Sequence, residues 1–326
     1  MRIGVLGAAG IAPEALLEPA RENPDVDIAA IAARDLSRAH EFAAKHRVRE
    51  VHASYEELLA DPSIDAVYNP TPNGLHGRWT LAALAAGKHV LCEKPFTANA
   101  TEARLVADAA DAAGLVVMEA FHYRYHPFMR RMEELLASGE LGEVQHVETA
   151  VCFPLPRFKD IRYNLALAGG ATMDAGCYAV HMARLLGGST PTVVSAQAKL
   201  KSPDVDRAMT ASLKFASGAT GRIRCSLWSS DVLRITARVQ CSNGELRAIN
   251  PLSPRYWHRL SIRRGASRSV ERFTHRPSYA YQLEAFADAV LRDAPVSTSA
   301  TDAIETMTVI DAIYEAAGLR PRVPTS

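Results

Sequence analysis

Short, nearly unbroken apolar runs alternate with segments of helical periodicity through the first 120 residues. The apolar runs are "RIGVLG", "VDIAAIAAR", "IDAVYNP", "HVLCEK" and "LVVMEA", separated by helical stretches such as "SRAHEFAAKH" and "GRWTLAALAAG". Strands that lack polar alternation, each followed by a helix, are typical of a parallel sheet covered on both faces. The pattern predicts an α/β fold that opens with a doubly wound Rossmann domain over residues 1–122.

The pattern changes after residue 123. A helical stretch, "PFMRRMEELLASGELG", leads into strands of period two, among them "EVQHVETAVCF" and "TVVSAQAKL", with turn signals at Ser217-Gly218 and Asn243-Gly244. Such strands are typical of an antiparallel sheet with one exposed face. The last stretches are helical again and end at Gly318. Residues 123–326 are therefore predicted to form an α+β domain with a large, open-faced, mainly antiparallel sheet.

Composition excludes several classes of partner. The 326 residues carry a formal net charge of +1, so no electrostatic footprint for nucleic acid is present. No apolar run approaches the roughly 18 residues of a membrane span, and the first residues enter a strand without a signal peptide. The five cysteines are odd in number and widely spaced. We expect a cytoplasmic protein with reduced thiols and no membrane partner.

The first strand-to-helix turn is a candidate pyrophosphate site. In a Rossmann domain this turn uses main-chain amides and the helix dipole to bind the phosphates. The stretch "VLGAAGIA" offers Gly7, Ala9, Gly10 and Ile11, but Ala9 and Ala12 replace two glycines of the usual fingerprint. A plain strand-to-helix turn is the alternative.

The end of the second strand bears on which dinucleotide binds. NAD sites place an acidic side chain about 20 residues past the fingerprint, whereas this strand ends in Arg34, with Arg38 nearby. A guanidinium suits the 2′-phosphate of NADP. NADP is the preferred cofactor; NAD stays possible through Asp35, which is also a plausible helix N-cap.

Two further strand ends should face the same crevice, because open α/β sheets bind ligands at the carboxyl ends of their strands. "NPTPNGLH" would present Thr71, Asn73 and His76, and "HVLCEK" would present Glu93 and Lys94. A lysine next to an oxidised nicotinamide and partly removed from water should have a lowered pKa, and it could share the proton lost by an alcohol. A structural lysine at a strand end is the alternative.

Residues 169–188 carry a third group of polar side chains. Asp174, Tyr178 and His181 stand at i, i+4 and i+7, so one helix face could hold all three. A tyrosine hydroxyl beside a lysine is a credible acid/base, since the cation favours phenolate; half-buried packing residues are the alternative. His122 and His126 have the spacing of paired metal ligands, but without a third ligand no metal site is predicted.

These stretches together resemble the glucose-fructose oxidoreductase and inositol dehydrogenase family along the whole chain. The resemblance rests on "GAAGIA", "TPNGLH", "CEKP", "FHYRYHP", "LASGELGEV", "GGATMDAGCY" and "YAYQLEAF". Within the family the chain looks most like NADP-dependent aldose (D-xylose) 1-dehydrogenases and dimeric dihydrodiol dehydrogenases. The inositol dehydrogenase pattern D-x-G-x-H-x-x-D has Tyr178 and His181 at its last two positions here, which argues against an inositol substrate.

The resemblance implies a Lys94–Tyr178 pair that handles the proton, with Asp174 orienting the pair or the substrate. It also implies pairing of chains through the open sheet, as a homodimer or tetramer. The residues expected at the substrate are His122, Arg124, Phe153, Asp160, Arg162, Tyr163 and His181.

The sequence therefore favours an NADP-dependent oxidoreductase that transfers hydride to or from a carbon of an aldose or related cyclic polyol. A trans-dihydrodiol dehydrogenase and a keto-sugar reductase are the alternatives within the same chemistry. A regulator or scaffold that binds NADP without turnover is the alternative from another class.

Overall fold

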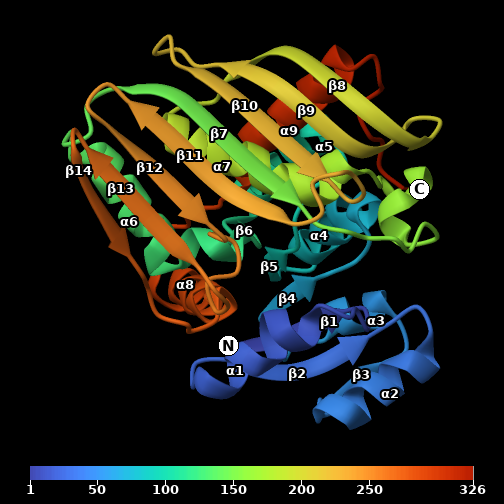
Figure 1. Cartoon of the computed structure of the whole chain (residues 1–326). Helices are drawn as coiled ribbons and strands as arrows, with labels where there is room; N and C mark the ends of the chain where they lie inside the picture. Colours follow the sequence, from blue (N-terminus) through green and yellow to red (C-terminus); the bar gives the residue numbers. More distant parts are fainter. Residues whose placement is uncertain (326) are drawn as a thin grey trace.

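The computed structural model describes residues 1–325, which form two β-sheets with helices packed on them (Figure 1). The first sheet is entirely parallel, in the order β3-β2-β1-β4-β5-β6. The order reverses beside β1, which opens a crevice at the carboxyl ends of the strands. Its strands are β1 (Arg2–Leu6), β2 (Asp27–Ala32), β3 (Glu50–His52), β4 (Ala66–Asn69), β5 (His89–Cys92) and β6 (Val117–Glu119).

Helices cover both faces of this sheet, as the unbroken apolar strands predict. Along β4, Ala66 and Tyr68 enter one apolar core while Val67 enters the other. Asp35 caps the helix after β2, as predicted, by accepting from the amides of Ser37 and Arg38. The helices of this part are α1 (Glu18–Glu22), preceded by a π-helical turn (Pro13–Leu17), α2 (Leu36–His46), α3 (Tyr55–Ala60), α4 (His76–Ala85) and α5 (Ala100–Ala113).

The second sheet has eight strands in the order β14-β13-β12-β11-β7-β10-β9-β8. Its central pair, β7 and β10, is parallel and its other neighbours are antiparallel. Within residues 1–325 one face packs against helices and the other carries none (Figure 1). Its strands are β7 (Val144–Cys152), β8 (Thr192–Ser202), β9 (Val205–Lys214), β10 (Thr220–Ser226), β11 (Arg234–Cys241), β12 (Gly244–Ile249), β13 (Arg259–Arg264) and β14 (Ser267–Glu271).

The helices of the second half join the two sheets. They are α6 (Pro127–Ala137), α7 (Cys177–Gly187), preceded by a π-helical turn (Thr172–Gly176), α8 (Ser278–Arg292) and α9 (Ala300–Ala316). α9 packs on α5 and on β8, while α8 packs on α1. The division between residues 122 and 123 stays a prediction. No helix within residues 1–325 is both long and apolar enough to cross a membrane.

The chain after α9 returns to the joint between the two halves. The Arg322 guanidinium is 1% exposed and pairs at 3.0 Å with the fully buried carboxylate of Asp206. Asp206 also accepts from Thr172 and from the Tyr314 hydroxyl, and Arg322 donates to the Gly169 carbonyl at 2.8 Å. This buried pair fixes the entry to the π-helical turn that carries Asp174.

Arg322→Ala should lower the free energy of unfolding by about 3–5 kcal/mol, because it leaves the Asp206 carboxylate buried without its cation. Urea-induced unfolding measures the effect. Arg320→Ala is the matched control: this side chain is exposed, and its loss should change stability by no more than about 0.5 kcal/mol. Equal effects of the two substitutions would contradict a stabilising role for the buried pair.

Candidate active site

A cavity of about 1310 Å³, here called the main cavity, lies at the carboxyl ends of the parallel strands. The loops after β1, β2, β4 and β5 line one side, and the opposite side comes from the loop after β7, the π-helical turn Thr172–Gly176 and the starts of α7 and α8. It contains every residue predicted to bind the cofactor. Those are Gly7, Ala9, Gly10, Ile11, Arg34, Arg38, Thr71, Asn73, His76, Glu93 and Lys94.

The turn after β1 lines the main cavity and keeps one glycine, Gly7, where the backbone requires it. Gly7 has φ of +114°, where a side chain would be strained. A Cβ there would also lie 3.2 Å from the Tyr55 hydroxyl. Ala8 and Ala9 then follow the cavity wall into the helix that begins at Pro13. The turn is therefore open to the main cavity, with Ala9 among its lining residues.

The end of β2 presents cations to the main cavity. Arg34 and Arg38 are exposed, and within residues 1–325 neither forms an ion pair with a carboxylate; Arg38 donates to the Ala8 carbonyl at 3.3 Å. Asp35 is engaged as the helix cap, and the hydrogen bond from the Ser37 hydroxyl is the main cause that lowers its pKa. This arrangement suits a phosphate better than a bare ribose hydroxyl.

His76 ties the loop after β4 to the loop after β5. Its two ring nitrogens lie 2.7 Å from the carbonyls of Thr71 and Pro95. Burial lowers the pKa of His76 to about 4. Asn69 supports the same loop by donating to the His76 carbonyl and accepting from the Thr71 hydroxyl. The neutral ring has a single N–H and can donate to one of the two carbonyls, while it packs between both loops at the border of the main cavity.

Asp174 is the charged centre of the far wall. Its carboxylate is 7% exposed and lies 3.2 Å from the Lys94 ammonium and 3.2 Å from Nε of Arg162. Arg162 also pairs with Asp160 at 3.1 Å. The two cations outweigh the effect of burial and hold the pKa of Asp174 below its usual value. Lys94, Asp174 and Arg162 thus form one ion-pair chain across the cavity.

In contrast to the effect predicted for burial beside a nicotinamide, the protein's own groups together do not lower the pKa of Lys94. Burial by itself lowers it, but the Asp174 carboxylate, with help from Glu93, raises the pKa of Lys94 above its usual value. Glu93 accepts from the buried Tyr68 hydroxyl at 2.8 Å, and burial raises its own pKa. The sequence pattern identified both the half-buried lysine and Asp174, but not that Asp174 keeps the lysine charged.

Tyr178 meets Lys94 through its ring and not through its hydroxyl. The ammonium lies 5.1 Å from the ring centroid, while the hydroxyl lies 3.5 Å from Nε2 of His122. Burial, followed by the Glu93 charge, raises the pKa of Tyr178 well above its usual value. The expectation that Lys94 favours phenolate is therefore not met in this state, and Tyr178 is a neutral phenol that can donate a proton.

Two of the residues expected at the substrate lie elsewhere. Arg124 and His181 line a second hollow of about 370 Å³ at α7 and the start of α9. Arg124 pairs there with Glu133. His181 hydrogen-bonds to the Tyr123 hydroxyl and to Asp302 and stacks on Phe121, so its ring is held away from the main cavity.

Of the remaining substrate predictions, only Arg162 lines the main cavity. His122 contacts Tyr178 and Tyr279, which do. Three side chains fall outside because other contacts hold them: Phe153 packs on the apolar core, Asp160 caps a short turn and pairs with Arg162, and Tyr163 donates to the Leu155 carbonyl.

Several lining residues were not found from the sequence. They include Tyr55, Trp79, Ile161, Leu167, Tyr279 and Thr325. Tyr55 and Trp79 pack edge to face with ring centroids 4.6 Å apart, a pattern that periodicity cannot distinguish from core packing. Thr325 reaches the cavity because its amide and hydroxyl bind the carbonyls of Gly74 and Ala166. No local signal in the sequence indicates that contact.

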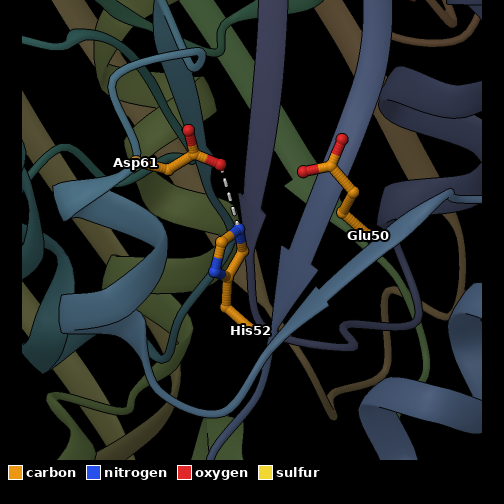
Figure 2. A group of neighbouring side chains, drawn as sticks. All are labelled: Glu50, His52 and Asp61. Carbon is orange, nitrogen blue, oxygen red and sulfur yellow. Dashed lines mark ion pairs between the residues drawn. The ribbon is translucent and has the colours of Figure 1, made fainter.

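One group of possible metal ligands occurs within residues 1–325, away from this cavity: Glu50, His52 and Asp61 (Figure 2). Nε2 of His52 lies 3.3 Å from the Asp61 carboxylate, and the exposed Glu50 pairs at 3.0 Å with Arg2. Asp61 is thus a polar neighbour of His52, and Arg2 is a polar neighbour of Glu50. His122 and His126, which share a helical spacing, bind separate partners: Ser278 and the amide of Phe128.

Two family models match this chain. One describes an oxidoreductase family with an NAD-binding Rossmann fold and matches residues 1–121; the other describes the GFO/IDH/MocA C-terminal domain and matches residues 129–247. The chain is 41% identical to D-xylose 1-dehydrogenase (NADP(+)) 2 of Haloferax volcanii over 97% of both chains. It is 36% identical to human trans-1,2-dihydrobenzene-1,2-diol dehydrogenase over 69% of this chain and 66% of that one.

A solved structure has a similar fold. A 3-ketoreductase from Actinomadura kijaniata, in complex with NADP and TDP-benzene, superimposes with a TM-score of 0.89 over 97% of both chains at 29% identity. At this coverage the likeness spans both sheets.

Asp174→Asn should lower the pKa of Lys94, because the substitution removes the carboxylate that opposes burial. Competitive acylation of the cofactor-free protein, read by peptide mass spectrometry, follows the reactive amine as a function of pH. We expect its midpoint to fall by at least about one pH unit. Asp160→Asn, which removes only the outer partner of Arg162, should leave the midpoint in place. An unchanged midpoint in Asp174→Asn would contradict the assignment.

Proposed function

The chain belongs to the GFO/IDH/MocA oxidoreductase family, and from that premise we propose that it is an NADP-dependent dehydrogenase of aldoses or related cyclic polyols. The observation that carries the proposal is the main cavity. It joins the Gly7 turn and two free arginines at one end to a lysine, a carboxylate and a tyrosine at the other. A dinucleotide and a sugar-sized substrate therefore have adjoining surfaces suited to their chemistry.

The cofactor end favours NADP. The Gly7 turn would bind the pyrophosphate through main-chain amides, and Arg34 and Arg38 would bind the 2′-phosphate. Asp35, the group that NAD would need, is already engaged as a helix cap. Bound NADP would accept or deliver the hydride. The Haloferax relative is named for NADP, in agreement with this assignment.

We propose that Lys94 and Tyr178 handle the proton and that Asp174 orients them. The Tyr178 phenol is protonated and half-buried at the cavity wall, so it can donate to a carbonyl oxygen during reduction and take the proton back during oxidation. The Lys94 ammonium would hydrogen-bond the reacting oxygen and stabilise the negative charge that develops on it. Asp174 keeps that ammonium charged and fixes its position.

Reduction of a keto-sugar is the second candidate. A tyrosine with a raised pKa is protonated at neutral pH, which is the form that reduction of a carbonyl requires, and the similar structure from Actinomadura kijaniata is named a 3-ketoreductase. Oxidation of a trans-dihydrodiol would use the same three side chains.

We propose that two chains pair through the open face and rim of the eight-stranded sheet. Large apolar side chains are exposed on the edge strand β8 and on the loop between β10 and β11, a composition expected of an interface. They include Val194, Leu200, Trp228, Val232 and Leu233. We also propose a cytoplasmic location, since all five cysteines are buried free thiols.

Arg34→Ala should weaken NADPH binding by about 10–100-fold, the loss expected for a charge-assisted hydrogen bond. NADH binding, measured by the same fluorescence titration, is the internal control and should change little because NADH lacks the 2′-phosphate. Equal losses for the two nucleotides would contradict the 2′-phosphate role.

The proposed reaction is tested by NADP+ reduction with a panel of aldoses, inositols and cyclic vicinal diols, and by NADPH oxidation with keto-sugars. We expect turnover with aldoses, and we expect Lys94→Met and Tyr178→Phe to lower kcat by about 10²–10⁴-fold. NADPH binding should survive in Tyr178→Phe, because Tyr178 is not among the residues predicted to bind the cofactor. Tyr281→Phe, outside the cavity, is the matched control. Near-normal turnover by Tyr178→Phe would refute the proton role, and silence across the panel would refute the substrate class.

A further inference from the structure

The hydroxyl of Tyr178 has a neighbour that the sequence pattern did not assign to it. Nε2 of His122 lies 3.5 Å from this oxygen, a long contact of the kind that tightens when substrate binds. Among residues 1–325 no other side chain hydrogen-bonds to the hydroxyl, since the Lys94 ammonium lies over the ring. The environment of His122 therefore bears directly on the proton at Tyr178.

His122 is a buried, neutral imidazole. It is 5% exposed, its ring packs against Tyr279 with centroids 4.0 Å apart, and Nδ1 lies 2.7 Å from the Ser278 hydroxyl. Burial lowers the pKa of His122 to about 3. A neutral imidazole carries a single N–H, so the hydrogen bonds to Ser278 and Tyr178 must run in one of two directions.

The direction of the two hydrogen bonds follows from the requirement that each buried donor has an acceptor. If Nδ1–H donated to Ser278, the serine hydrogen would be left without an acceptor among the described residues, although Ser278 is only 4% exposed. If the Ser278 hydroxyl donates to Nδ1, both groups are satisfied and Nε2–H points to Tyr178. An unmet buried donor costs about 1–3 kcal/mol, so the second direction is favoured.

We propose that His122 is a positioning residue that donates from Nε2–H to the Tyr178 oxygen, with its tautomer set by Ser278. The inference rests on the proposed proton role of Tyr178. Donation from Nε2 leaves the Tyr178 hydrogen free to point into the main cavity at the substrate oxygen. When Tyr178 gives up that hydrogen, the same N–H stabilises the phenolate oxygen, a position that the Lys94 ammonium does not occupy.

The tautomer can be read without turnover. The ¹⁵N shifts of histidine-labelled, cofactor-free protein distinguish a protonated ring nitrogen from a bare one, and the His122 signals are those lost in His122→Gln. We expect the proton on Nε2. A proton on Nδ1 would overturn the proposal, whatever the kinetics show.

A second experiment measures the pH dependence of kcat/KM for substrate oxidation by the wild type and the variants. His122→Phe keeps an aromatic ring but loses the N–H, and should move the limb that reports Tyr178 to higher pH by about one to two units. His122→Gln supplies an amide N–H and should restore most of that shift; Ser278→Ala should shift the limb in the same direction as His122→Phe. His52→Gln, on β3, is the matched control and should not move it.

A role for His122 as substrate wall only predicts a different result: KM rises in His122→Phe while the pH profile stays in place. That outcome would overturn the proposal. Failure of the proposed function is separate, because it shows as normal turnover by Tyr178→Phe or as no turnover by the wild type.

Discussion

The arrangement of the site depends on one buried carboxylate. Asp174 comes from the helical turn under the eight-stranded sheet, Lys94 from the end of β5 in the parallel sheet, and Arg162 from the loop after β7. An ionised carboxylate removed from water is stable only beside cations. One of these cations, Lys94, comes from the first half and the other, Arg162, from the second. The Asp174 carboxylate therefore has both of its cations only when the two halves are packed together, which also assembles the site.

The groups around this centre are already held before any ligand arrives. His76 joins the carbonyls of Thr71 and Pro95, and Glu93 is held by the Tyr68 hydroxyl, so the backbone on both sides of Lys94 is fixed. Charged groups fixed in advance stabilise developing charge without reorganisation. The ion pair with Asp174 keeps Lys94 protonated although its side chain is largely removed from water.

Chain position alone located half of this site. In a parallel sheet the residues after each strand meet at one edge. The sequence alone could therefore place the Gly7 turn, Arg34, Thr71 and Lys94 at one cavity. The far wall was harder. A regular helix through Asp174, Tyr178 and His181 would put all three on one face, but the chain is π-helical over Thr172–Gly176. Tyr178 and His181 both follow this turn, within α7, and the tertiary contacts separate them: Tyr178 lines the cavity, whereas His181 contacts Tyr123 and Asp302.

Lys94 and His122 contact different parts of Tyr178, the ring and the hydroxyl, and the spacing of residues in the sequence could not show this. The Lys94 charge lies over the ring and is balanced by Asp174, so its effect on the phenolic oxygen is small. The oxygen itself faces a neutral histidine whose orientation depends on Ser278, a residue 156 positions further along the chain. Such a contact exists only after α8 has packed beside the turn that follows β6. Control over the proposed proton transfer is therefore a property of the tertiary packing, whereas Tyr178, the proposed proton carrier, can be picked out from the local sequence around it.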